Sequence, residues 1–276
     1  TGSGKTLAFC LPIIESLLKN PKPYYALILA PTRELCLQIQ EHLNSIGSSI
    51  GLKSVVIVGG LDLMSQSVAL VSKKPHVIIA TPGRILHHLE KTKGFNLQSL
   101  AYLVMDEADK LLNMNFEEDL DKIIEKLPKK RVTFLFSATM TNKVSKLQRV
   151  SLSNPVKIEI SNSKHQTVNS LVQNYIFIPH KYKESYLVYL INEFIKKSTI
   201  IFVSTCKGAM KICLLLRNLG FESVPIHGQM TQVKRINSIA KFKANEQNIL
   251  VATDVASRGL DIPGVDLVIN YDLSLD

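Results

Sequence analysis

The chain has 276 residues, of which 46% are hydrophobic and 20% charged, and its 33 Lys and Arg against 23 Asp and Glu give a net charge of +10. This length favours two domains, and this hydrophobic content excludes an intrinsically disordered chain. No apolar run reaches the 18 or more residues of a membrane span, and the excess of positive charge suggests a polyanionic partner.

The first half of the chain alternates amphipathic stretches with short apolar runs. A helix is predicted from Thr6 to Leu18, and Asn20-Pro21-Lys22-Pro23 ends it. Uniformly apolar strands that alternate with helices indicate a parallel sheet covered on both faces. The other predicted helices cover 33–47, 61–72, 84–92, 117–127 and 141–152, and the predicted strands cover 25–29, 54–58, 77–80, 102–105, 132–136 and 156–160.

A polar segment without hydrophobic period, residues 161–170, has the composition of a linker. The alternation resumes beyond it, and both halves of the chain carry net positive charge. The predicted fold class is therefore α/β, with two tandem units, 1–160 and 171–276, each built on a mostly parallel sheet with helices on both faces. In the second unit the predicted strands cover 173–178, 199–203, 223–226, 248–252 and 266–270, and the predicted helices cover 181–196, 207–219 and 231–243.

One of the apolar runs is followed directly by acidic residues. Tyr102–Met105 has the pattern of a strand buried on both faces, and Asp106, Glu107 and Asp109 follow it. The carboxyl edge of such a sheet is where α/β folds bind ligands, although the acids alone are equally explained by the positive N-terminus of a following helix. Binding is favoured because the chain opens with Thr1-Gly2-Ser3-Gly4-Lys5-Thr6, the second half of a phosphate-binding loop. A Lys for phosphate and an acid for magnesium form one nucleotide site.

Small, hydroxylated or basic residues follow nearly all the other strands. Hydroxyls, Arg and glycine-exposed N–H groups suit phosphate oxygens, but each residue alone is also explained as a helix cap, a first-turn Pro or a Gly with positive φ. Their repetition in both units of a chain with a phosphate loop favours binding. The set is Pro31, Thr32, Arg33, Gly59, Gly60, Thr81, Pro82, Gly83, Arg84, Ser137, Thr139, Thr205, His227, Gly228, Thr253 and Asp254.

Cysteines and histidines form no metal-binding pattern. None of the four cysteines lies in a C-x-x-C pair, so neither a zinc site nor a disulfide framework is predicted, and free thiols in a reducing compartment are expected. The neighbours His87 and His88 are predicted to lie on a polar helix face.

Taken together, these motifs resemble those of the DEAD-box RNA helicases, and the match covers essentially the whole chain. Two further stretches, Phe177–Lys183 and Leu216–Phe221, resemble the nucleolar branch that processes small-subunit ribosomal RNA precursors. The motifs are Gly2–Thr6, Pro31–Leu35, Gly59-Gly60, Thr81–Arg84, Asp106–Asp109, Ser137–Thr139, Ile201–Thr205, His227–Met230 and Ala252–Asp261.

The resemblance implies two RecA-like domains that close around ATP and RNA. It implies that Lys5, Asp106 and Glu107 are catalytic, that Thr6 and Asp106 hold Mg²⁺, and that Glu107 orients or deprotonates the attacking water. Asp109, Ser137 and Thr139 are implied to link the ATP site to domain closure. The implied nucleotide contacts are Thr1, Gly2, Ser3, Gly4, Lys5 and Thr6, with Gly259 and Asp261 from the second domain.

The same resemblance implies that single-stranded or duplex RNA is bound through its backbone, with selectivity through the 2′-hydroxyl. It also implies ribosome-assembly proteins as partners, a monomer, no membrane, and a place in the nucleus, in the nucleolus. Gln232 and Arg235 match an RNA-side motif, although a solvated helix face is an alternative. The implied RNA contacts are Pro31, Thr32, Arg33, Gly59, Gly60, Thr81, Pro82, Gly83, Arg84, Thr205, His227, Gly228, Gln232, Arg235, Thr253, Asp254 and Arg258.

The sequence departs from the family pattern at both ends. The segment before Thr1, where the family keeps an adenine-reading glutamine and the first strand, is not in the chain, and the chain stops at Asp276, before the arginine-finger motif. An arginine finger contributes roughly 10³ to 10⁵ in rate. We therefore expect that these 276 residues hydrolyse ATP barely or not at all, whereas the full-length protein is an RNA-stimulated ATPase. The alternatives are a non-catalytic, ATP-gated RNA clamp and a P-loop ATPase that acts on DNA.

Overall fold

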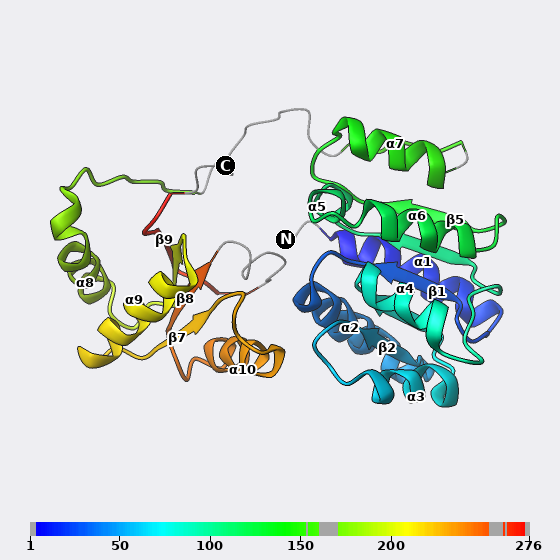
Figure 1. Cartoon of the computed structure of the whole chain (residues 1–276), viewed down its shortest axis with the longest axis horizontal. Coiled ribbons are helices and arrows are strands. Elements are labelled where there is room, and N and C mark those ends of the chain that lie inside the picture. The colour runs from blue at the N-terminus through cyan, green and yellow to red at the C-terminus, as the bar shows by residue number, and fades with distance from the viewer. Residues whose placement is uncertain (1–3, 153, 160–170, 254–261, 263, 274–276) are drawn as a thin grey trace. The chain divides into compact units, whose positions relative to one another are not determined.

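The structure is a computed structural model that describes residues 4–152, 154–159, 171–253, 262 and 264–273 (Figure 1). The chain divides into two compact units between Ser153 and Asn154. Each unit contains one sheet, and every strand pairing in the described residues is parallel. The α/β fold class predicted from the alternation of strands and helices is confirmed. The predicted linker at 161–170 lies outside the described residues.

The first unit has a five-stranded sheet in which neighbouring strands end level with one another. Leu29, the last residue of β1, pairs with both Ala80 of β3 and Met105 of β4, so the carboxyl ends form one straight edge. The sheet order is β2-β3-β1-β4-β5. The strands are β1 (Ala26–Leu29), β2 (Ser54–Ile57), β3 (Val77–Ala80), β4 (Tyr102–Met105) and β5 (Val132–Leu135).

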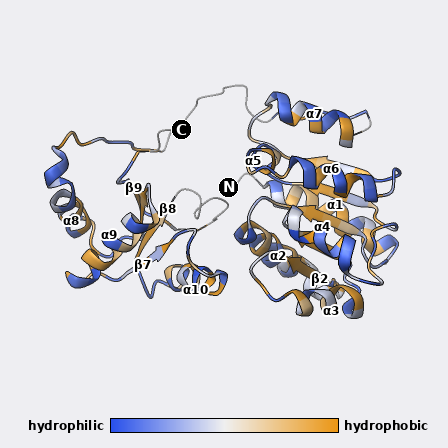
Figure 2. Cartoon of the chain, in the orientation of Figure 1, coloured by the Kyte–Doolittle hydropathy of each residue, from blue (hydrophilic) through white to orange (hydrophobic). Residues whose placement is uncertain are grey.

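Helices cover both faces of this sheet because its strands are apolar on both sides. Leu27 and Leu29 pack into one core with α3 to α7, whereas Ala26 and Ile28 pack into a second core with α1 and α2. Figure 2 shows the strands as largely hydrophobic, with both hydrophobic and hydrophilic segments on the helices around them. The helices are α1 (Lys5–Lys19), α2 (Arg33–Gly47), α3 (Leu63–Lys73), α4 (Pro82–Lys91), α5 (Ala108–Asn113), α6 (Glu117–Lys126) and α7 (Asn142–Ser151), with a 3-10 turn η1 (Ser48–Ile50).

The second unit repeats the pattern with a four-stranded sheet in the order β7-β8-β6-β9. Leu187 and Ile191 of α8 pack with Ile212 of α9 on Ile201 of β6. The elements are η2 (His180–Tyr182), α8 (Lys183–Glu193), β6 (Thr199–Val203), α9 (Cys206–Asn218), β7 (Ser223–Ile226), α10 (Gln232–Lys243), β8 (Ile249–Thr253) and β9 (Leu267–Asn270).

Two predicted strands are wrong. Residues 156–159 and 173–178 contain no strand, and Val156 and Phe177 are 88% and 98% exposed. Both runs have strand-like composition, but no other described strand pairs with them, and a strand without a partner is not stabilised. The short helix α5 was not predicted. The other predicted strands and helices of the described residues are confirmed to within a few residues at their ends.

Several smaller expectations can also be compared with the structure. All four cysteines are free, and Cys10, Cys36 and Cys213 are buried. The prediction that His88 lies on a polar helix face is wrong, because His88 is fully buried on the inner side of α4. No helix in the described parts of the chain is long and apolar enough to span a membrane.

Candidate functional site

The level edge of the first sheet brings the predicted residues together in two groups. Because all five strands run parallel, the residues after each strand lie at the same edge. The residues predicted to contact RNA follow the neighbouring strands β2, β3 and β1. The acids predicted for the ATP site follow β4, and the residues predicted to couple that site to domain closure follow β4 and β5. From one end of the edge to the other, the sequence of segments is 59–60, 81–84, 31–33, 106–109 and 137–139.

The charges of Lys5 and Asp106 interact, which agrees with the predicted phosphate-binding site. Lys5 is the first residue of α1 and follows Gly4, whose φ of 75° is left-handed and suits a residue without a side chain. Burial raises the pKa of Asp106, and the charge of Glu107 adds to this effect. The positive charges of Lys5 and Lys110 oppose the increase in the pKa of Asp106, so the Lys5 ammonium lies within electrostatic reach of this carboxylate.

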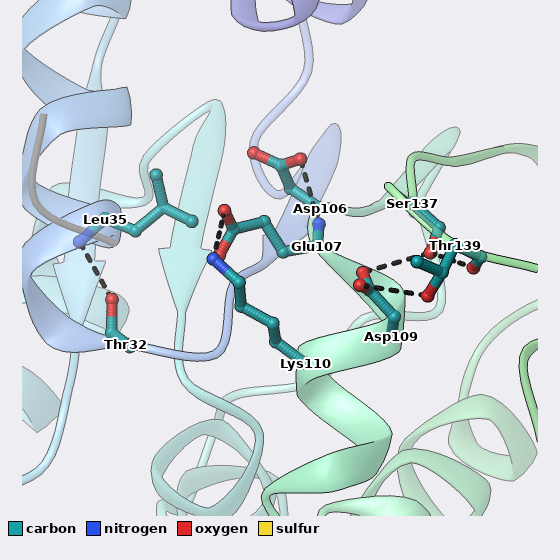
Figure 3. Close-up of polar contacts among 8 residues, drawn as sticks. All are labelled: Thr32, Leu35, Asp106, Glu107, Asp109, Lys110, Ser137 and Thr139. Carbon is teal, nitrogen blue, oxygen red and sulfur yellow. Dashed lines mark hydrogen bonds and ion pairs between the residues drawn. The ribbon is translucent and has the colours of Figure 1, made fainter. Parts of the chain in front are cut away.

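The three carboxylates after β4 point in three directions (Figure 3). Asp106 is 4% exposed, and its Oδ1 accepts a hydrogen bond of 2.9 Å from the backbone N–H of Glu107. Oε1 of Glu107 forms an ion pair of 2.8 Å with Nζ of Lys110, whereas its Oε2 is buried without a hydrogen-bond partner. Asp109 turns towards the loop after β5. Consecutive acids therefore have separate surroundings, which suits separate roles.

Asp109 ties α5 to the loop that follows β5. Its Oδ1 accepts a hydrogen bond of 3.0 Å from Ser137, and its Oδ2 accepts one of 3.3 Å from Thr139. The backbone N–H of Ala108 adds a bond of 2.9 Å to the carbonyl of Phe136. Asp109 also lies in the first turn of α5, so the helix-terminus explanation of this acid holds as well. The three residues predicted to couple the ATP site to domain closure thus form one network.

The residues around Asp106 suit Mg²⁺. The described residues contain no group of three or more His, Cys, Asp or Glu side chains that would hold a metal ion alone. Mg²⁺ is typically bound by one or two carboxylates together with water and substrate phosphates, so a single buried carboxylate with the Thr6 hydroxyl in the first turn of α1 matches this chemistry. A nearby cation would also offset the burial that raises the pKa of Asp106.

In the half of the edge that is predicted to contact RNA, helix capping explains some of the residues but not all of them. Thr32 caps α2, because its hydroxyl accepts a bond of 3.3 Å from the N–H of Leu35. Thr81 precedes α4 but makes no such bond, so capping does not account for its hydroxyl. Arg33 lies against Gly59, where a Cβ would come within 3.2 Å of its Nη2. Glycine at 59 therefore leaves room for a guanidinium at this edge.

Other residues of this half are held by loop contacts. Arg84 donates a hydrogen bond of 3.3 Å to the carbonyl of Leu61, which connects the start of α4 to the loop after β2. Gly60, in that loop, has a φ of 77° and so needs the freedom of glycine. A Cβ at Gly83 would come within 3.2 Å of Oδ2 of Asp119. Pro82 occupies the first turn of α4, as expected of a helix-starting Pro.

The second unit presents a similar edge. Thr205, after β6, caps α9 with a bond of 2.9 Å to the N–H of Gly208. His227, after β7, is 5% exposed, and its pKa is lowered by burial and by the charge of Arg235. Thr253, at the end of β8, is also buried. Gln232 is 3% exposed, so the alternative that it lies on a solvated helix face is wrong.

Some predicted residues lie outside the described parts of the chain, and one residue at the site was not predicted. The former are Thr1, Gly2, Ser3, Asp254, Arg258, Gly259 and Asp261. The missed residue is Lys110, which pairs with Glu107 and influences the pKa of Asp106. Its spacing of three residues from Glu107 is the signal that sequence reasoning did not use, because i and i+3 side chains are neighbours on a helix.

Comparison with known proteins identifies two family matches. Residues 1–147 match the DEAD/DEAH box helicase model, and residues 182–276 match the helicase conserved C-terminal domain. The chain is 62% identical to the probable ATP-dependent RNA helicase DDX47 of Homo sapiens over 273 residues, which cover 99% of this chain and 60% of that protein. It is 58% identical to the ATP-dependent rRNA helicase rrp3 of Aspergillus fumigatus over 276 residues, or 100% of this chain and 58% of that one.

A solved structure agrees with this match. Dbp5 of S. cerevisiae bound to RNA and ADP BeF3 aligns with a TM-score of 0.85 at 30% identity, over 99% of this chain and 69% of that chain. The chain thus spans about 60% of the length of the curated relatives it matches.

Proposed function

The chain belongs to the DEAD-box family of helicases, and on this premise we propose that the protein is an ATP-dependent RNA helicase. It couples ATP binding and hydrolysis to the clamping and local unwinding of RNA. The observation that supports the proposal is the level carboxyl edge of the first sheet: Asp106 and Glu107 follow β4 beside the segments that suit RNA phosphates, and the charge of Lys5 acts on Asp106. We assign residues 1–160 to the ATP-binding domain, 161–170 to a linker and 171–276 to the second domain.

In the proposed reaction, Lys5 and the first-turn N–H groups of α1 bind the phosphates of ATP. Anions suit this position because helix N-termini carry partial positive charge and free N–H donors. Water attacks the γ-phosphorus, its new O–P bond forms as the bond to the β-phosphate oxygen breaks, and its proton passes to Glu107. The products are ADP and phosphate. Positioning and charge neutralisation supply most of the rate enhancement in such reactions.

Asp106 and Thr6 would hold Mg²⁺ at the same site, where the ion would supply positive charge against the negative charge of the phosphates. Asp109, Ser137 and Thr139 connect the acids after β4 to the loop after β5. We propose that this network couples the ATP site to domain closure, because its hydrogen bonds join the two segments into one unit. Gly259 and Asp261 complete the proposed nucleotide contacts from the second domain.

The RNA is proposed to lie along the edges of both sheets and to contact them through its phosphates. Arg33 and Arg84 supply positive charge, Thr81 supplies a hydroxyl not used for capping, and Gly60 exposes backbone. Thr205, Gly228 and Thr253 offer hydroxyl and backbone groups on the second edge. Phosphate contacts carry no sequence information, so preference for RNA over DNA depends on the 2′-hydroxyl.

The similarity to a protein named as an rRNA helicase supports a finer assignment. We propose that the RNA is a ribosomal RNA precursor and that the protein acts in the nucleolus as a monomer, with ribosome-assembly proteins as partners. Immunoprecipitation of the tagged protein with sequencing of crosslinked RNA tests this assignment. Enrichment of ribosomal precursor RNA is expected, and enrichment of messenger RNA alone would contradict it.

The central experiment measures ATP hydrolysis by the full-length protein with and without single-stranded RNA. RNA is expected to stimulate turnover well above that of Glu107→Gln, which removes the proton acceptor. Turnover no greater than that of Glu107→Gln would favour the non-catalytic RNA clamp. Single-stranded DNA of the same sequence is the matched control, because equal stimulation by DNA would favour a DNA-dependent ATPase.

A further inference from the structure

Lys110 makes the ion pair that is most closely tied to the proposed catalytic acids. Its Nζ lies 2.8 Å from Oε1 of Glu107, and the two side chains are 37% and 19% exposed. Fully exposed pairs are worth little because water screens them, but this pair is partly withdrawn from water on the Glu107 side. The pair joins the residue before α5 to the first turn of that helix. Lys110 therefore restrains Glu107 from a position only three residues away in the chain.

The backbone also restricts where Glu107 can point. Its φ of 50° and ψ of 51° are left-handed, a conformation that a residue with a side chain rarely adopts. The surroundings impose it: the N–H of Glu107 donates to Oδ1 of Asp106, and its carbonyl accepts from the N–H groups of Lys110 and Leu111 at 2.9 and 3.0 Å. With the backbone fixed at both sides, the remaining freedom of Glu107 is that of its side-chain rotamers.

The two carboxylate oxygens of Glu107 differ. Oε1 is taken by Lys110, whereas Oε2 is buried and has no hydrogen-bond partner. A buried acceptor without a donor is costly, and in native proteins it usually marks a place that water or a ligand occupies. Lys110 already pairs with Oε1, so Oε2 is the oxygen of this carboxylate that has no partner and can accept from an incoming donor.

We propose that Lys110 is a positioning residue for hydrolysis: it holds Glu107 through Oε1 and so presents Oε2 to the attacking water. The proposal rests on the proposed ATPase function and adds a residue to it. In the step it serves, the water proton passes to Oε2 as the oxygen of that water bonds to the γ-phosphorus and ADP departs. In this role Lys110 acts on the reaction through the orientation of Glu107, the residue with which its ammonium pairs.

The first test compares three variants of the full-length protein. Lys110→Met keeps the aliphatic stem and removes the charge, Lys110→Arg keeps the charge, and Lys19→Met is the matched control because it breaks an exposed Lys–Glu pair of 2.7 Å at the far end of α1. Lys110→Met should lower kcat about 10- to 100-fold and leave the KM for ATP within about twofold, since misplacing a catalytic group affects the chemical step. Lys110→Arg should restore most of kcat, and Lys19→Met should have no effect.

A second measurement does not depend on turnover. A crystal structure of Lys110→Met without nucleotide should show the Glu107 side chain in a different or mixed rotamer, while its melting temperature stays close to that of the unaltered protein. If this variant melts much lower, Lys110→Gln takes its place in both tests. A kcat within twofold of the unaltered protein, or an unmoved Glu107 carboxylate, would overturn the proposal.

Glu107→Gln separates failure of this inference from failure of the proposed function. If Lys110 acts through Glu107, adding Lys110→Met to Glu107→Gln should cause no further loss of kcat, because the group that it positions is already disabled. Full loss in Glu107→Gln with no loss in Lys110→Met would refute only the positioning role. No RNA-stimulated turnover in the unaltered protein would refute the proposed function itself.

Discussion

Among the residues, the acids after β4 illustrate how neighbours in sequence acquire different chemistry from their surroundings. Asp106 is buried within electrostatic reach of Lys5, Glu107 is held by Lys110, and Asp109 accepts two hydroxyl hydrogen bonds. The left-handed backbone at Glu107 separates the three directions, since a continuous helix would place Asp106 and Asp109 on one face. One residue with an unusual φ thus allows a compact acidic segment to direct its three carboxylates to three different surroundings.

The Asp109 network is tested by Asp109→Asn. An amide offers one acceptor oxygen where the carboxylate offers two, so one of the hydroxyls of Ser137 and Thr139 loses its acceptor. We expect the free energy of unfolding to fall by about 1–2 kcal/mol and RNA stimulation of ATPase activity to decrease. Urea unfolding and ATPase assays measure the two effects. Asp121→Asn, on an exposed position of α6, is the control; an equal effect there would rule out a specific network.

His88 gives the fold a dependence on pH. Burial lowers its pKa to about 4, with smaller contributions from the charges of Arg84 and His87, and its Nδ1 lies 2.8 Å from Oγ1 of Thr92. Between pH 6.5 and 4 the unfolded chain protonates this residue and the folded chain does not, so the free energy of unfolding falls as pH falls. From pH 7.5 to pH 5 we expect a loss of about 2 kcal/mol from this group.

The measurement for His88 is urea unfolding across this pH range. His88→Gln should remove this part of the pH dependence, at some cost in stability at every pH. His87→Gln, the exposed neighbour on α4, should retain it. If His88→Gln and the unaltered protein lose stability in parallel between pH 7.5 and 5, His88 does not titrate as its burial indicates.

At the scale of elements, the apolar runs that pair with other strands were predicted correctly, whereas two runs that have no pairing strand among the described residues were wrongly predicted as strands. The apolar run 102–105 predicts both ends of β4 correctly, because burial on both faces demands an unbroken apolar pattern. Residues 173–178 also contain an apolar run, Tyr175–Ile178, but a strand depends on a partner that local sequence does not specify. The helix α5 was missed because six residues carry too little periodicity.

For the candidate site, the sequence predicts which residues follow each strand but not how their side chains are arranged. The motifs indicate which residues follow each strand, and the parallel order of the sheet then gathers them. The rotamers of Glu107 and the role of Lys110 depend on a left-handed residue between β4 and α5, and sequence periodicity does not report backbone φ. The burial of His88 was likewise missed because it depends on how α4 packs.

The caps of the helices give a prediction at this scale. Thr205 accepts a bond of 2.9 Å from the N–H of Gly208 at the start of α9, so Thr205→Val should cost about 1 kcal/mol of unfolding free energy in the second unit. Thr205→Ser keeps the hydroxyl and should preserve stability. Both are measured by urea unfolding. If RNA affinity falls in Thr205→Val and not in Thr205→Ser, the hydroxyl serves RNA binding as well as capping; equal stability of the two variants would contradict the capping role.

For the whole molecule, the relevant property is that two separate sheets each present an edge of hydroxyl, basic and backbone groups. Both halves of the chain carry net positive charge, and their combined net charge is +10. Charge alone attracts any polyanion, so it does not account for dependence on ATP. A nucleotide that holds both units on one RNA strand would instead increase the number of phosphates contacted at once.

This idea predicts how salt affects RNA binding by the full-length protein. Each phosphate contact to a single strand contributes about −0.7 to the slope of log K against log salt concentration. We expect a steep slope with a non-hydrolysable ATP analogue and a shallower one without nucleotide, because fewer phosphates are contacted when the units do not share the strand. Fluorescence anisotropy with a short labelled RNA at several salt concentrations measures both slopes. Arg33→Gln and Arg84→Gln should each make the slope with nucleotide shallower by about 0.7, the contribution of one phosphate contact. Equal slopes with and without nucleotide would mean that ATP does not bring the second edge onto the RNA.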